Sequence, residues 1–313
     1  MKLRFGLIVI LIALILIGCS SEPQTNEVKM AVLPVLDALP MYVAEAQGYF
    51  EDEGLTVELV PVASAPERDS LMQAGQVDAI LNEIVSTLFY NQDEEKVVIV
   101  RFLRIATEDY PVFRILASAE SGITSVEDLK GVEIGISEGT VIEYTTDRIL
   151  QNAGLTADEI VGVAIPKIPD RIALLASGEL MAANLPDPAA TAALAQGALL
   201  IIDDTTIPEI SSSVITFDGE MAEMNPDTVK RFLNAIEKAV EDINADKDKW
   251  IDLMVEKGLL PPPLVGKYTI PDFPTASVPN EAQYLDALQW ALEAGILTES
   301  ADYAGSVSGD FLP

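Results

Sequence analysis

The sequence predicts an α/β protein built as two doubly wound lobes that face each other across one cleft and are joined by a two-segment hinge. Three observations support this prediction. A β-α-β-α-β pattern occurs twice along the chain, strands and helices alternate within each copy, and a later strand can return the chain to the first copy. Such alternation is typical of parallel sheets covered by helices. A length of 313 residues is also sufficient for two domains.

The clearest evidence for duplication is a pair of similar segments. One begins at Pro66 and reads PERDSLMQAGQVDAI, and the other begins at Pro169 and reads PDRIALLASGELMAA. Proline, arginine, leucine, glycine and alanine recur in register, and an acidic residue follows each proline. Self-similarity of this kind indicates a repeated structural unit.

The elements of each copy follow from local patterns. Residues 28–32 and 132–136 alternate as strands do. A helix follows each of them and ends at a Gly-Leu pair, where glycine supplies the left-handed C-cap. The predicted helices are 40–53 and 141–153, the second strands 56–60 and 160–165, and the third strands 78–81 and 181–185.

Two strands connect the predicted lobes. Residues 112–117 carry the chain out of the first lobe, and residues 211–217 can bring it back. Two crossing strands make a natural hinge. We therefore expect lobe one to comprise 28–113 plus 214–313 and lobe two to comprise 114–213. Two sequential domains with separate sites are the alternative.

The chain after the second crossing is predicted to be helical. Asn225 followed by Pro226 marks a helix start, with asparagine as the N-cap and proline in the first turn. The apolar face of this helix comprises Phe232, Leu233, Ile236, Val240 and Ile243. Further helices are expected near 250–257 and 281–294, packed on lobe one.

The N-terminal residues predict the location of the protein. Lys2 and Arg4 flank the start of an apolar run that reaches Ile17, the pattern of a secretory signal. The run is shorter than the roughly 20 residues of a membrane span. Cys19 follows Leu-Ile-Gly and resembles the lipid-modified cysteine of a bacterial lipoprotein. We expect a signal peptide at 1–18 and a lipidated polar tether at 19–27. An uncleaved anchor helix with a chance cysteine is the alternative.

Composition excludes several classes of function. The net charge is −31, and loss of residues 1–18 with Lys2 and Arg4 makes it −33. A surface this acidic repels nucleic acid. Solubility or salt adaptation explains the charge, and docking to a basic partner is the alternative. The chain has no histidine and only one cysteine, so we expect no metal site, no cofactor and no nucleophile of the Ser/His or Cys/His type. Carboxylate-only catalysis remains open.

Four motifs carry a resemblance to a known family. They are MYVAEAQGYFEDEGL at 41–55, AGQVDA at 74–79, DLKG at 128–131 and PDPAA at 186–190. In this order and spacing they resemble the binding proteins for nitrate, sulfonates, taurine and thiamine-pyrimidine precursors, often called NMT1-like or SsuA-like, over about residues 28 to 295. The resemblance implies the type II periplasmic-binding fold, which closes on its ligand.

The candidate ligand site lies where strands end, because ligands of doubly wound sheets bind beyond the carboxyl ends of the strands. In lobe one these positions are Leu36, Asp37, Ala38, Asn82 and Glu83, and in lobe two they are Ser137, Glu138, Gly139, Thr140, Asn184 and Asp187. Tyr42 and Tyr110 can each supply an aromatic wall.

The chemistry of these residues points in two directions. Ser137, Gly139 and Thr140 open a helix, whose free N–H groups suit an anion such as a sulfonate, nitrate or carboxylate; simple N-capping by Ser137 is the alternative. The acids Asp37, Glu83, Glu138 and Asp187 have no basic neighbour in sequence. Carboxylates of this kind suit N–H or O–H donors. This favours a nitrogen heterocycle, such as a pyrimidine precursor or flavin, over an oxyanion.

The resemblance and the motifs together predict a non-enzymatic solute-binding lipoprotein of an ABC importer. We expect a monomer anchored through Cys19 on the outer face of the cytoplasmic membrane, partnered by permease and ATPase subunits. A ligand-sensing receptor for a membrane sensor is the alternative. The resemblance also includes a pyrimidine-precursor synthase that uses histidine and a cysteine-rich motif. This chain lacks both, so that activity is not expected.

Overall fold

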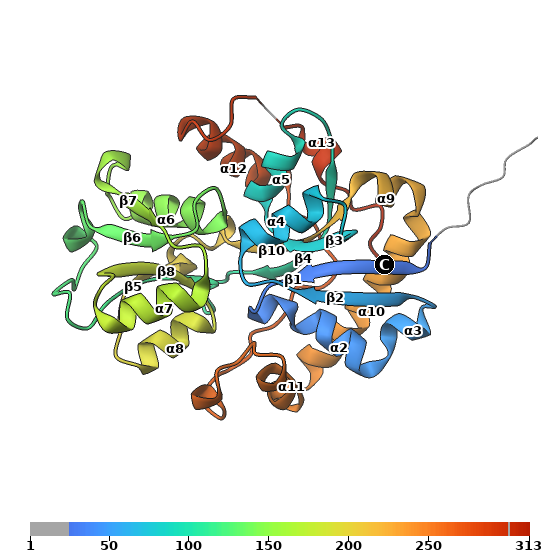
Figure 1. Cartoon of the computed structure of the whole chain (residues 1–313), viewed down its shortest axis with the longest axis horizontal. Helices are drawn as coiled ribbons and strands as arrows, with labels where there is room; N and C mark the ends of the chain where they lie inside the picture. Colours follow the sequence, from blue (N-terminus) through green and yellow to red (C-terminus); the bar gives the residue numbers. More distant parts are fainter. Residues whose placement is uncertain (1–24, 300) are drawn as a thin grey trace, which may run out of the picture.

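The computed structural model describes residues 25–299 and 301–313, and it contains two mixed sheets of five strands each. Figure 1 shows the two sheets side by side, each with helices on both faces, as two lobes of one α/β molecule. The two-lobe architecture predicted from the duplicated pattern is confirmed. The predicted signal peptide 1–18 and Cys19, the predicted site of lipid modification, lie outside the described residues.

The sheet of lobe one has the strand order β2-β1-β3-β10-β4. Its strands are β1 (Glu27–Val32), β2 (Thr56–Pro61), β3 (Ala79–Asn82), β4 (Val97–Ile105) and β10 (Ser212–Asp218). β1 pairs in parallel with β2 and β3, as predicted. β10 is antiparallel to β3 and β4, so the returning strand makes the sheet mixed, while the repeated unit itself is parallel. The chain returns from lobe two at the edge where β1 and β3 end, so β10 must run in the opposite direction.

The sheet of lobe two repeats this arrangement, with the order β7-β6-β8-β5-β9. Its strands are β5 (Phe113–Ala117), β6 (Glu133–Ile136), β7 (Val161–Ala164), β8 (Ala182–Pro186) and β9 (Leu199–Asp203). β6 pairs in parallel with β7 and β8, and β5 is the antiparallel strand. Each sheet therefore receives one antiparallel strand from the chain that arrives from the other lobe.

Two segments cross between the lobes. The first follows β4 and reaches β5, and the second follows β9 and reaches β10. The carboxylate of Asp204 in the second segment accepts hydrogen bonds from the backbone N–H of Val112 (3.1 Å) and of Phe113 (2.9 Å). The two crossings are thus bonded to each other.

The helices of the duplicated units cover both faces of the sheets. In lobe one they are α2 (Leu39–Gln47), α3 (Tyr49–Asp52), α4 (Ala65–Gln73) and α5 (Ile84–Asn91), and in lobe two α6 (Val141–Asn152), α7 (Ile168–Ser177) and α8 (Ala189–Ala195). The single helix predicted over 40–53 is broken into α2 and α3 because Gly48 adopts a φ of +74°. Glycine reaches this left-handed conformation without steric cost.

The C-terminal helices are α9 (Gly219–Met224), α10 (Pro226–Ala245), α11 (Ile251–Glu256), α12 (Glu281–Glu293) and α13 (Tyr303–Ser306). All five predicted apolar residues of α10 are fully buried, and Phe232 stacks on Phe50 of α3. Asn225 precedes α10, but its side chain does not cap the helix. Its amide oxygen accepts instead from the N–H of Thr25, at 2.9 Å.

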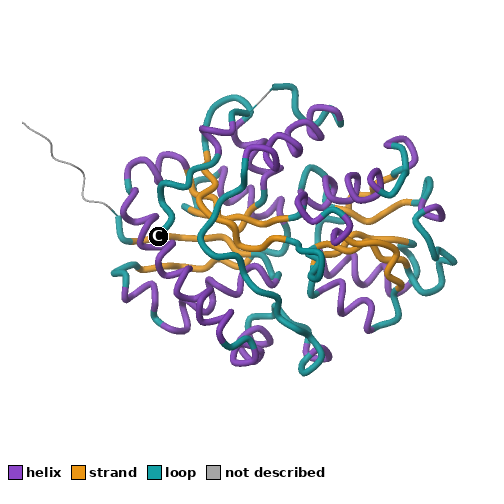
Figure 2. The backbone as a smooth tube through the Cα atoms, turned by 180° about the vertical axis from the view of Figure 1, so that it is seen from behind, coloured by secondary structure: helices purple, strands orange, loops and turns teal. Residues whose placement is uncertain are grey.

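A long segment without strands joins α11 to α12. Figure 2 shows it running as a loop across the back of lobe one. It is fixed there by the buried Arg101 of β4, which donates to the carbonyl of Pro274 (2.9 Å) and to the carboxylate of Glu237 (2.5 Å). The segment then leads to α12, which contacts helices of both lobes, whereas we expected the C-terminal helices to pack on lobe one alone.

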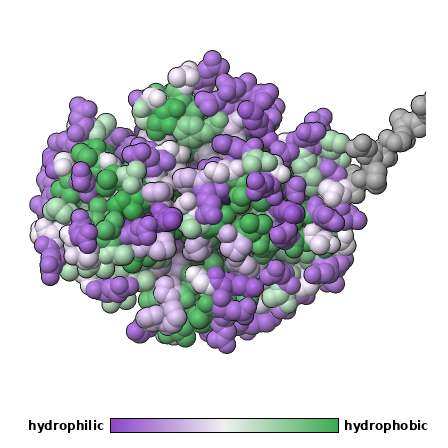
Figure 3. Space-filling view, viewed as in Figure 1, coloured by the Kyte–Doolittle hydropathy of each residue, from purple (hydrophilic) through white to green (hydrophobic). Residues whose placement is uncertain are grey.

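Figure 3 shows hydrophilic side chains over most of one face of the molecule, as the acidic composition predicts. Among the described residues, no helix combines the length and the apolar character needed to cross a bilayer.

Candidate ligand-binding site

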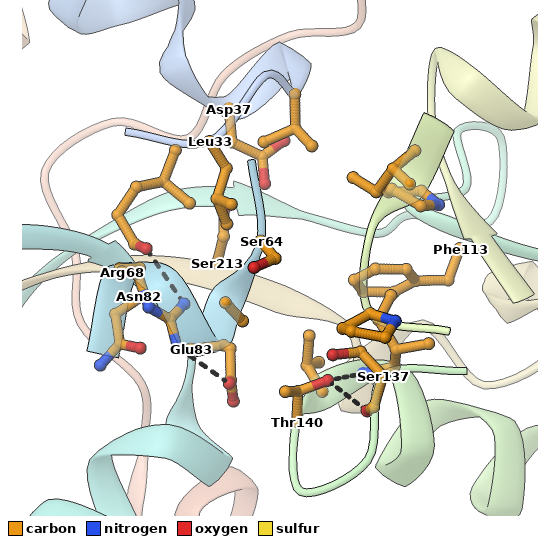
Figure 4. Close-up of a pocket in the computed structure, with 18 of the residues that line it drawn as sticks. Leu33, Asp37, Ser64, Arg68, Asn82, Glu83, Phe113, Ser137, Thr140 and Ser213 are labelled. Atoms are coloured by element: carbon orange, nitrogen blue, oxygen red, sulfur yellow. Dashed lines mark hydrogen bonds and ion pairs between the residues drawn. The ribbon is translucent and has the colours of Figure 1, made fainter. Parts of the chain in front are cut away.

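A cavity lies between the lobes, where the strand ends of both sheets meet. It encloses about 600 Å³ of empty space, part of which is open to solvent. Its walls come from the carboxyl ends of β1, β3, β6 and β8, from the first residues of β5 and β10, and from the starts of α4, α6 and α7. This is the position expected for a ligand site in doubly wound sheets. Figure 4 shows Arg68 and Glu83 on one side of the cavity and Phe113, Ser137 and Thr140 on the other.

Arg68 supplies a buried positive charge from lobe one. Its Nε donates to Asp69 Oδ1 at 2.8 Å, and its Nη1 donates to the carbonyl of Leu81 at 3.2 Å. Its Nη2 lies 3.8 Å from Glu83 Oε1 and has no hydrogen-bond partner. Burial lowers the pKa of Arg68, but Asp69 and Glu83 raise that pKa by more. Arg68 is therefore charged and already balanced by acids of its own lobe.

Arg171 supplies the second buried positive charge, from lobe two. Its Nη1 donates to the carbonyls of Ile165 (2.7 Å) and Pro166 (3.3 Å), while its Nε has no partner. Within the described part of the chain, no carboxylate forms an ion pair with it. Burial lowers the pKa of the Arg171 guanidinium to about 10, so it remains protonated at neutral pH. The cavity thus contains one cation without a counter-ion.

Glu83 lies at the start of α5, where one of its carboxyl oxygens caps the helix and the other has no hydrogen-bond partner among the described residues. Its Oε2 caps the helix by accepting from the N–H of Ser86 at 3.0 Å. Burial raises the pKa of Glu83 to about 7, although Arg68 and the Ser86 N–H act to lower it. Its Oε1 has no hydrogen-bond partner. Near neutral pH this carboxyl group can therefore either donate or accept a hydrogen bond.

The start of α6 presents hydroxyl groups to the cavity. Thr140, and not Ser137, caps this helix: its hydroxyl accepts from the N–H of Ile142 (3.2 Å) and donates to the carbonyl of Ser137 (2.7 Å). The alternative of N-capping by Ser137 is therefore wrong. The buried Ser137 Oγ has no partner, and neither does Ser213 Oγ across the cavity. Both hydroxyls remain available to a ligand.

Most of the remaining wall is apolar. Phe113 begins β5 and lies beside the strand ends of lobe two. The other apolar side chains of the wall include Leu33, Val35, Leu81, Val141, Ile142, Pro166, Ile168 and Pro186. A mostly apolar wall with a few convergent polar groups is typical of small-molecule sites.

The structure places five of the residues proposed from the sequence in this cavity, namely Asp37, Asn82, Glu83, Ser137 and Thr140. Leu36, Ala38 and Tyr42 lie instead in the hydrophobic core of lobe one. Glu138 is exposed at the surface. The N–H of Gly139 donates to Glu143 Oε2 at 2.7 Å, so one of the N–H groups expected to bind an anion is already used.

The other proposed residues lie outside the cavity. The amide of Asn184 donates to Thr145 Oγ1 (3.1 Å) and Thr146 Oγ1 (2.9 Å), which ties α6 to β8. Asp187 faces a separate surface hollow together with Tyr110, which is exposed. Asp187 Oδ2 accepts a hydrogen bond from the hydroxyl of Tyr268 at 2.5 Å.

Three of the four acids lie beside arginines, although no basic residue is their neighbour in sequence. Arg104 Nη1 lies 3.5 Å from Asp37 Oδ1. Arg114 forms an ion pair with Asp187, and Arg68 lies beside Glu83. The premise that these carboxylates lack a basic partner is therefore wrong for Asp37, Glu83 and Asp187, and the reason to favour a nitrogen heterocycle falls with it.

Four notable cavity residues were not among the candidates proposed from the sequence, namely Arg68, Phe113, Arg171 and Ser213. A signal for the two arginines was present, because they occupy matching positions in the repeated segments. Phe113 and Ser213 lie at the start of the antiparallel strands β5 and β10, and their place depends on a pairing that local sequence does not specify.

Comparison with known proteins supports this description of the fold. Residues 36–249 match the NMT1/THI5-like family. A 4-amino-5-hydroxymethyl-2-methylpyrimidine phosphate synthase of Candida albicans is 31% identical over 126 residues, which cover 40% of this chain and 36% of the relative. The chain thus matches about a third of that synthase.

Two further relatives are binding proteins. A putative aliphatic sulfonates-binding protein of Escherichia coli is 27% identical over 169 residues, covering 54% of this chain and 53% of the relative. The alkanesulfonate-binding protein SsuA from Xanthomonas axonopodis pv. citri, solved with MOPS, superposes with a TM-score of 0.77 at 19% identity, over 91% of this chain and 99% of that one.

The family match covers more than half of the chain, from Leu36 shortly after β1 to Lys249 shortly after α10. It includes lobe two, both crossings and the end of every cavity-lining strand except β1, whose Leu33 and Val35 precede it. The resemblance carried by the four short motifs is thus confirmed. This chain belongs to the NMT1/THI5-like family and has the two-lobed periplasmic-binding-protein fold.

Proposed function

We propose that this chain is the solute-binding component of an ABC importer, which captures a small molecule between its lobes and does not transform it. One observation carries the proposal. Nine buried side-chain N or O atoms lack a hydrogen-bond partner among the described residues, and six of them belong to residues that line the cavity. They belong to Arg68, Asn82, Glu83, Ser137, Arg171 and Ser213. Buried polar groups are normally paired, so this concentration supports a binding site for a polar ligand.

The ligand is best described as a small anion with an apolar body. Arg171 is a buried cation without a counter-ion, and burying such a charge is costly unless it is paired. Ser137 and Ser213 offer hydroxyls, and the wall around them is mostly apolar. A sulfonate or carboxylate head on an aliphatic or aromatic body satisfies all three features. The sulfonate relatives are in line with this class.

Binding without chemistry is favoured over the synthase activity of the fungal relatives. The residues that line the cavity include no histidine, cysteine, lysine or tyrosine. Glu83 is the acid with the strongly raised pKa, and it is occupied as the N-cap of α5. A cavity with this lining can hold a solute but has no nucleophile paired with a base.

Membrane anchoring forms a separate part of the proposal. The apolar run up to Ile17 and the following Cys19 support export and lipid modification, with the folded body on the outer face of the cytoplasmic membrane. The permease and ATPase subunits are the expected partners. Incorporation of a labelled fatty acid into the wild-type chain, but not into Cys19→Ala, tests the anchor without reference to the ligand.

Thermal unfolding with a panel of candidate ligands tests the binding proposal. The panel comprises alkanesulfonates, taurine, nitrate, carboxylates, aminopyrimidines, thiamine, flavins and polyamines. A ligand at 100 times its dissociation constant stabilises the folded state by about 2.7 kcal/mol. We expect a rise in melting temperature with sulfonates or carboxylates that is lost in Arg171→Gln. A rise with aminopyrimidines or polyamines alone, or one unchanged in Arg171→Gln, contradicts the anion class. Turnover of a stabilising compound contradicts the binding-only role.

A further inference from the structure

Helix α12 is fixed to lobe one on one of its sides. The hydroxyl of Tyr284 donates to Ser306 Oγ at 2.7 Å, and the amide of Asn91, the last residue of α5, donates to the same oxygen at 2.9 Å. Val307, next to Ser306, bridges to Ile99 of β4. The position of α12 is therefore set by the sheet and helices of lobe one.

The opposite side of α12 contacts α6 of lobe two. Asp286 accepts from the hydroxyl of Tyr144 (2.5 Å) and from Nε of Arg148 (3.2 Å). One turn later, the indole N–H of Trp290 donates to Asp147 Oδ2 at 2.8 Å. The rings of Tyr144 and Trp290 meet edge to face, with centroids 5.4 Å apart. These contacts join the two lobes outside the cavity, and Figure 1 shows α12 above the junction of the lobes.

The same helix of lobe two also forms part of the cavity wall. Thr140, Val141 and Ile142, at the start of α6, line the cavity. Tyr144 and Arg148 follow on the next turns of this continuous helix. Asn184 ties α6 to the sheet of lobe two, so the helix must move with that lobe. Any displacement of α6 relative to α12 therefore also displaces the cavity wall relative to lobe one.

We propose that α12 is an interlobe latch, in which Asp286 and Trp290 of lobe one hold α6 and thereby position the cavity wall that α6 provides. Neither residue lines the cavity, so both are positioning residues. The latch itself follows from contacts between the lobes. Only its effect on ligand affinity rests on the proposed solute-binding function.

The latch can be tested without a ligand by fluorescence of Trp290. The chain has two tryptophans, and Trp250 is buried in the core of lobe one, so Trp250→Phe in the full chain leaves Trp290 as the only indole. Trp290 is 2% exposed. We expect acrylamide to quench its fluorescence several-fold more strongly after Asp286→Ala. Glu281→Ala is the matched control, because Glu281 is an exposed acid in the first turn of the same helix. Equal quenching in the two variants overturns the latch.

Tyr144→Phe provides a second variant that removes only the hydroxyl bound by Asp286. Tyr144→Phe tests the latch if Asp286→Ala does not fold. We expect it to increase acrylamide quenching of Trp290, but by less than Asp286→Ala. No increase with Tyr144→Phe in that case also overturns the proposal.

Affinity for MOPS, the sulfonate held by the Xanthomonas relative, provides the functional measurement. Loss of the Asp286 contacts should weaken MOPS binding about ten-fold, the equivalent of one to two hydrogen bonds. Glu281→Ala should leave the affinity unchanged. Equal affinities of the two variants contradict the positioning role. If the wild type does not bind MOPS while Trp290 responds as expected, the latch stands and the sulfonate assignment fails.

Discussion

Arg68 and Arg171 occupy equivalent positions in the two copies of the repeated unit, yet only Arg68 has acidic partners. Its guanidinium lies 2.8 Å from Asp69 and 3.8 Å from Glu83, whereas Arg171 bonds only to the carbonyls of Ile165 and Pro166 within the described chain. Duplication supplied both lobes with a cavity arginine. Asp69 and Glu83 balance the charge of Arg68, so Arg171 is the arginine that we propose for an anionic ligand.

The two arginines should therefore differ in what they contribute to stability. Arg68→Met leaves the carboxylates of Asp69 and Glu83 without their buried counter-ion, and breaking such a pair costs about 3–5 kcal/mol. Arg171→Met loses two hydrogen bonds to carbonyls but also removes an unpaired buried charge, so we expect a cost of about 1–2 kcal/mol. Urea unfolding of the ligand-free variants measures both values. An Arg171→Met variant that is as unstable as Arg68→Met contradicts the difference in pairing.

Glu83 should make stability fall as pH rises towards neutrality. Burial raises the pKa of this carboxyl group from 4.5 to about 7 in the folded protein. The folded state thus favours the protonated acid. This contribution is complete below about pH 4.5 and is lost as the pH rises through about 7.

Glu83→Gln isolates this contribution, since the amide does not titrate. The free energy of unfolding of the wild type minus that of Glu83→Gln should fall by about 3 kcal/mol between pH 4.5 and 7. Asp204, whose pKa burial raises to about 6, acts in the same direction, but it is present in both proteins and cancels in the difference. A flat or rising difference contradicts the assignment.

Asp187 should act on stability and lobe connection, although we first proposed it as a ligand contact. The buried carboxylate binds Arg114 and Thr191 of lobe two and the hydroxyl of Tyr268 in the segment after α11. Asp187→Ala leaves Arg114 without its partner, and we expect a loss of about 3–5 kcal/mol. Asp109→Ala, an exposed acid of the same surface hollow, is the control and should change stability by less than about 0.5 kcal/mol. Equal effects of the two variants contradict the role of Asp187.

Local patterns were sufficient for the lobes and for the edge that carries the site. The repeat, the alternating strands and the glycines placed the ends of β3 and β6 at one cleft, and Glu83 and Ser137 are found there. The direction of β10 was not predictable from these patterns, because it depends on where the chain re-enters lobe one. The direction of β10 is set by its pairing with β3 and β4 in the sheet, which the strand propensity of its residues does not specify.

Charge pairing could not be predicted for a related reason. Arg114 and Asp187 are 73 residues apart in sequence and meet only because β5 and β8 are neighbours in the sheet. The residues next to an acid in the sequence therefore do not show which charged side chains surround it in the folded protein. The arginine repeated at Arg68 and Arg171 was visible, but its burial at the cavity follows only from the packing of α4 and α7 against the strand ends.

Substitutions of Ser137 and Thr140 should separate effects on ligand binding from effects on stability. Their hydroxyls lie three residues apart at the start of α6, and both residues line the cavity. The Thr140 hydroxyl caps the helix, whereas the Ser137 hydroxyl has no partner in the described chain. Thr140→Val should therefore cost about 1 kcal/mol of stability, the usual loss of an N-cap. Ser137→Ala should leave the ligand-free melting temperature unchanged or slightly raised, because a buried unpaired hydroxyl contributes no favourable bond.

Ligand binding should depend on Ser137 even though stability does not. If its hydroxyl completes a hydrogen bond to the anion, Ser137→Ala should weaken binding of the stabilising sulfonate or carboxylate about ten-fold. Calorimetric titration of both variants, alongside their unfolding curves, measures the two effects separately. A Ser137→Ala protein that is destabilised but binds normally reverses the assignment, because the hydroxyl then stabilises α6 and is not a ligand contact.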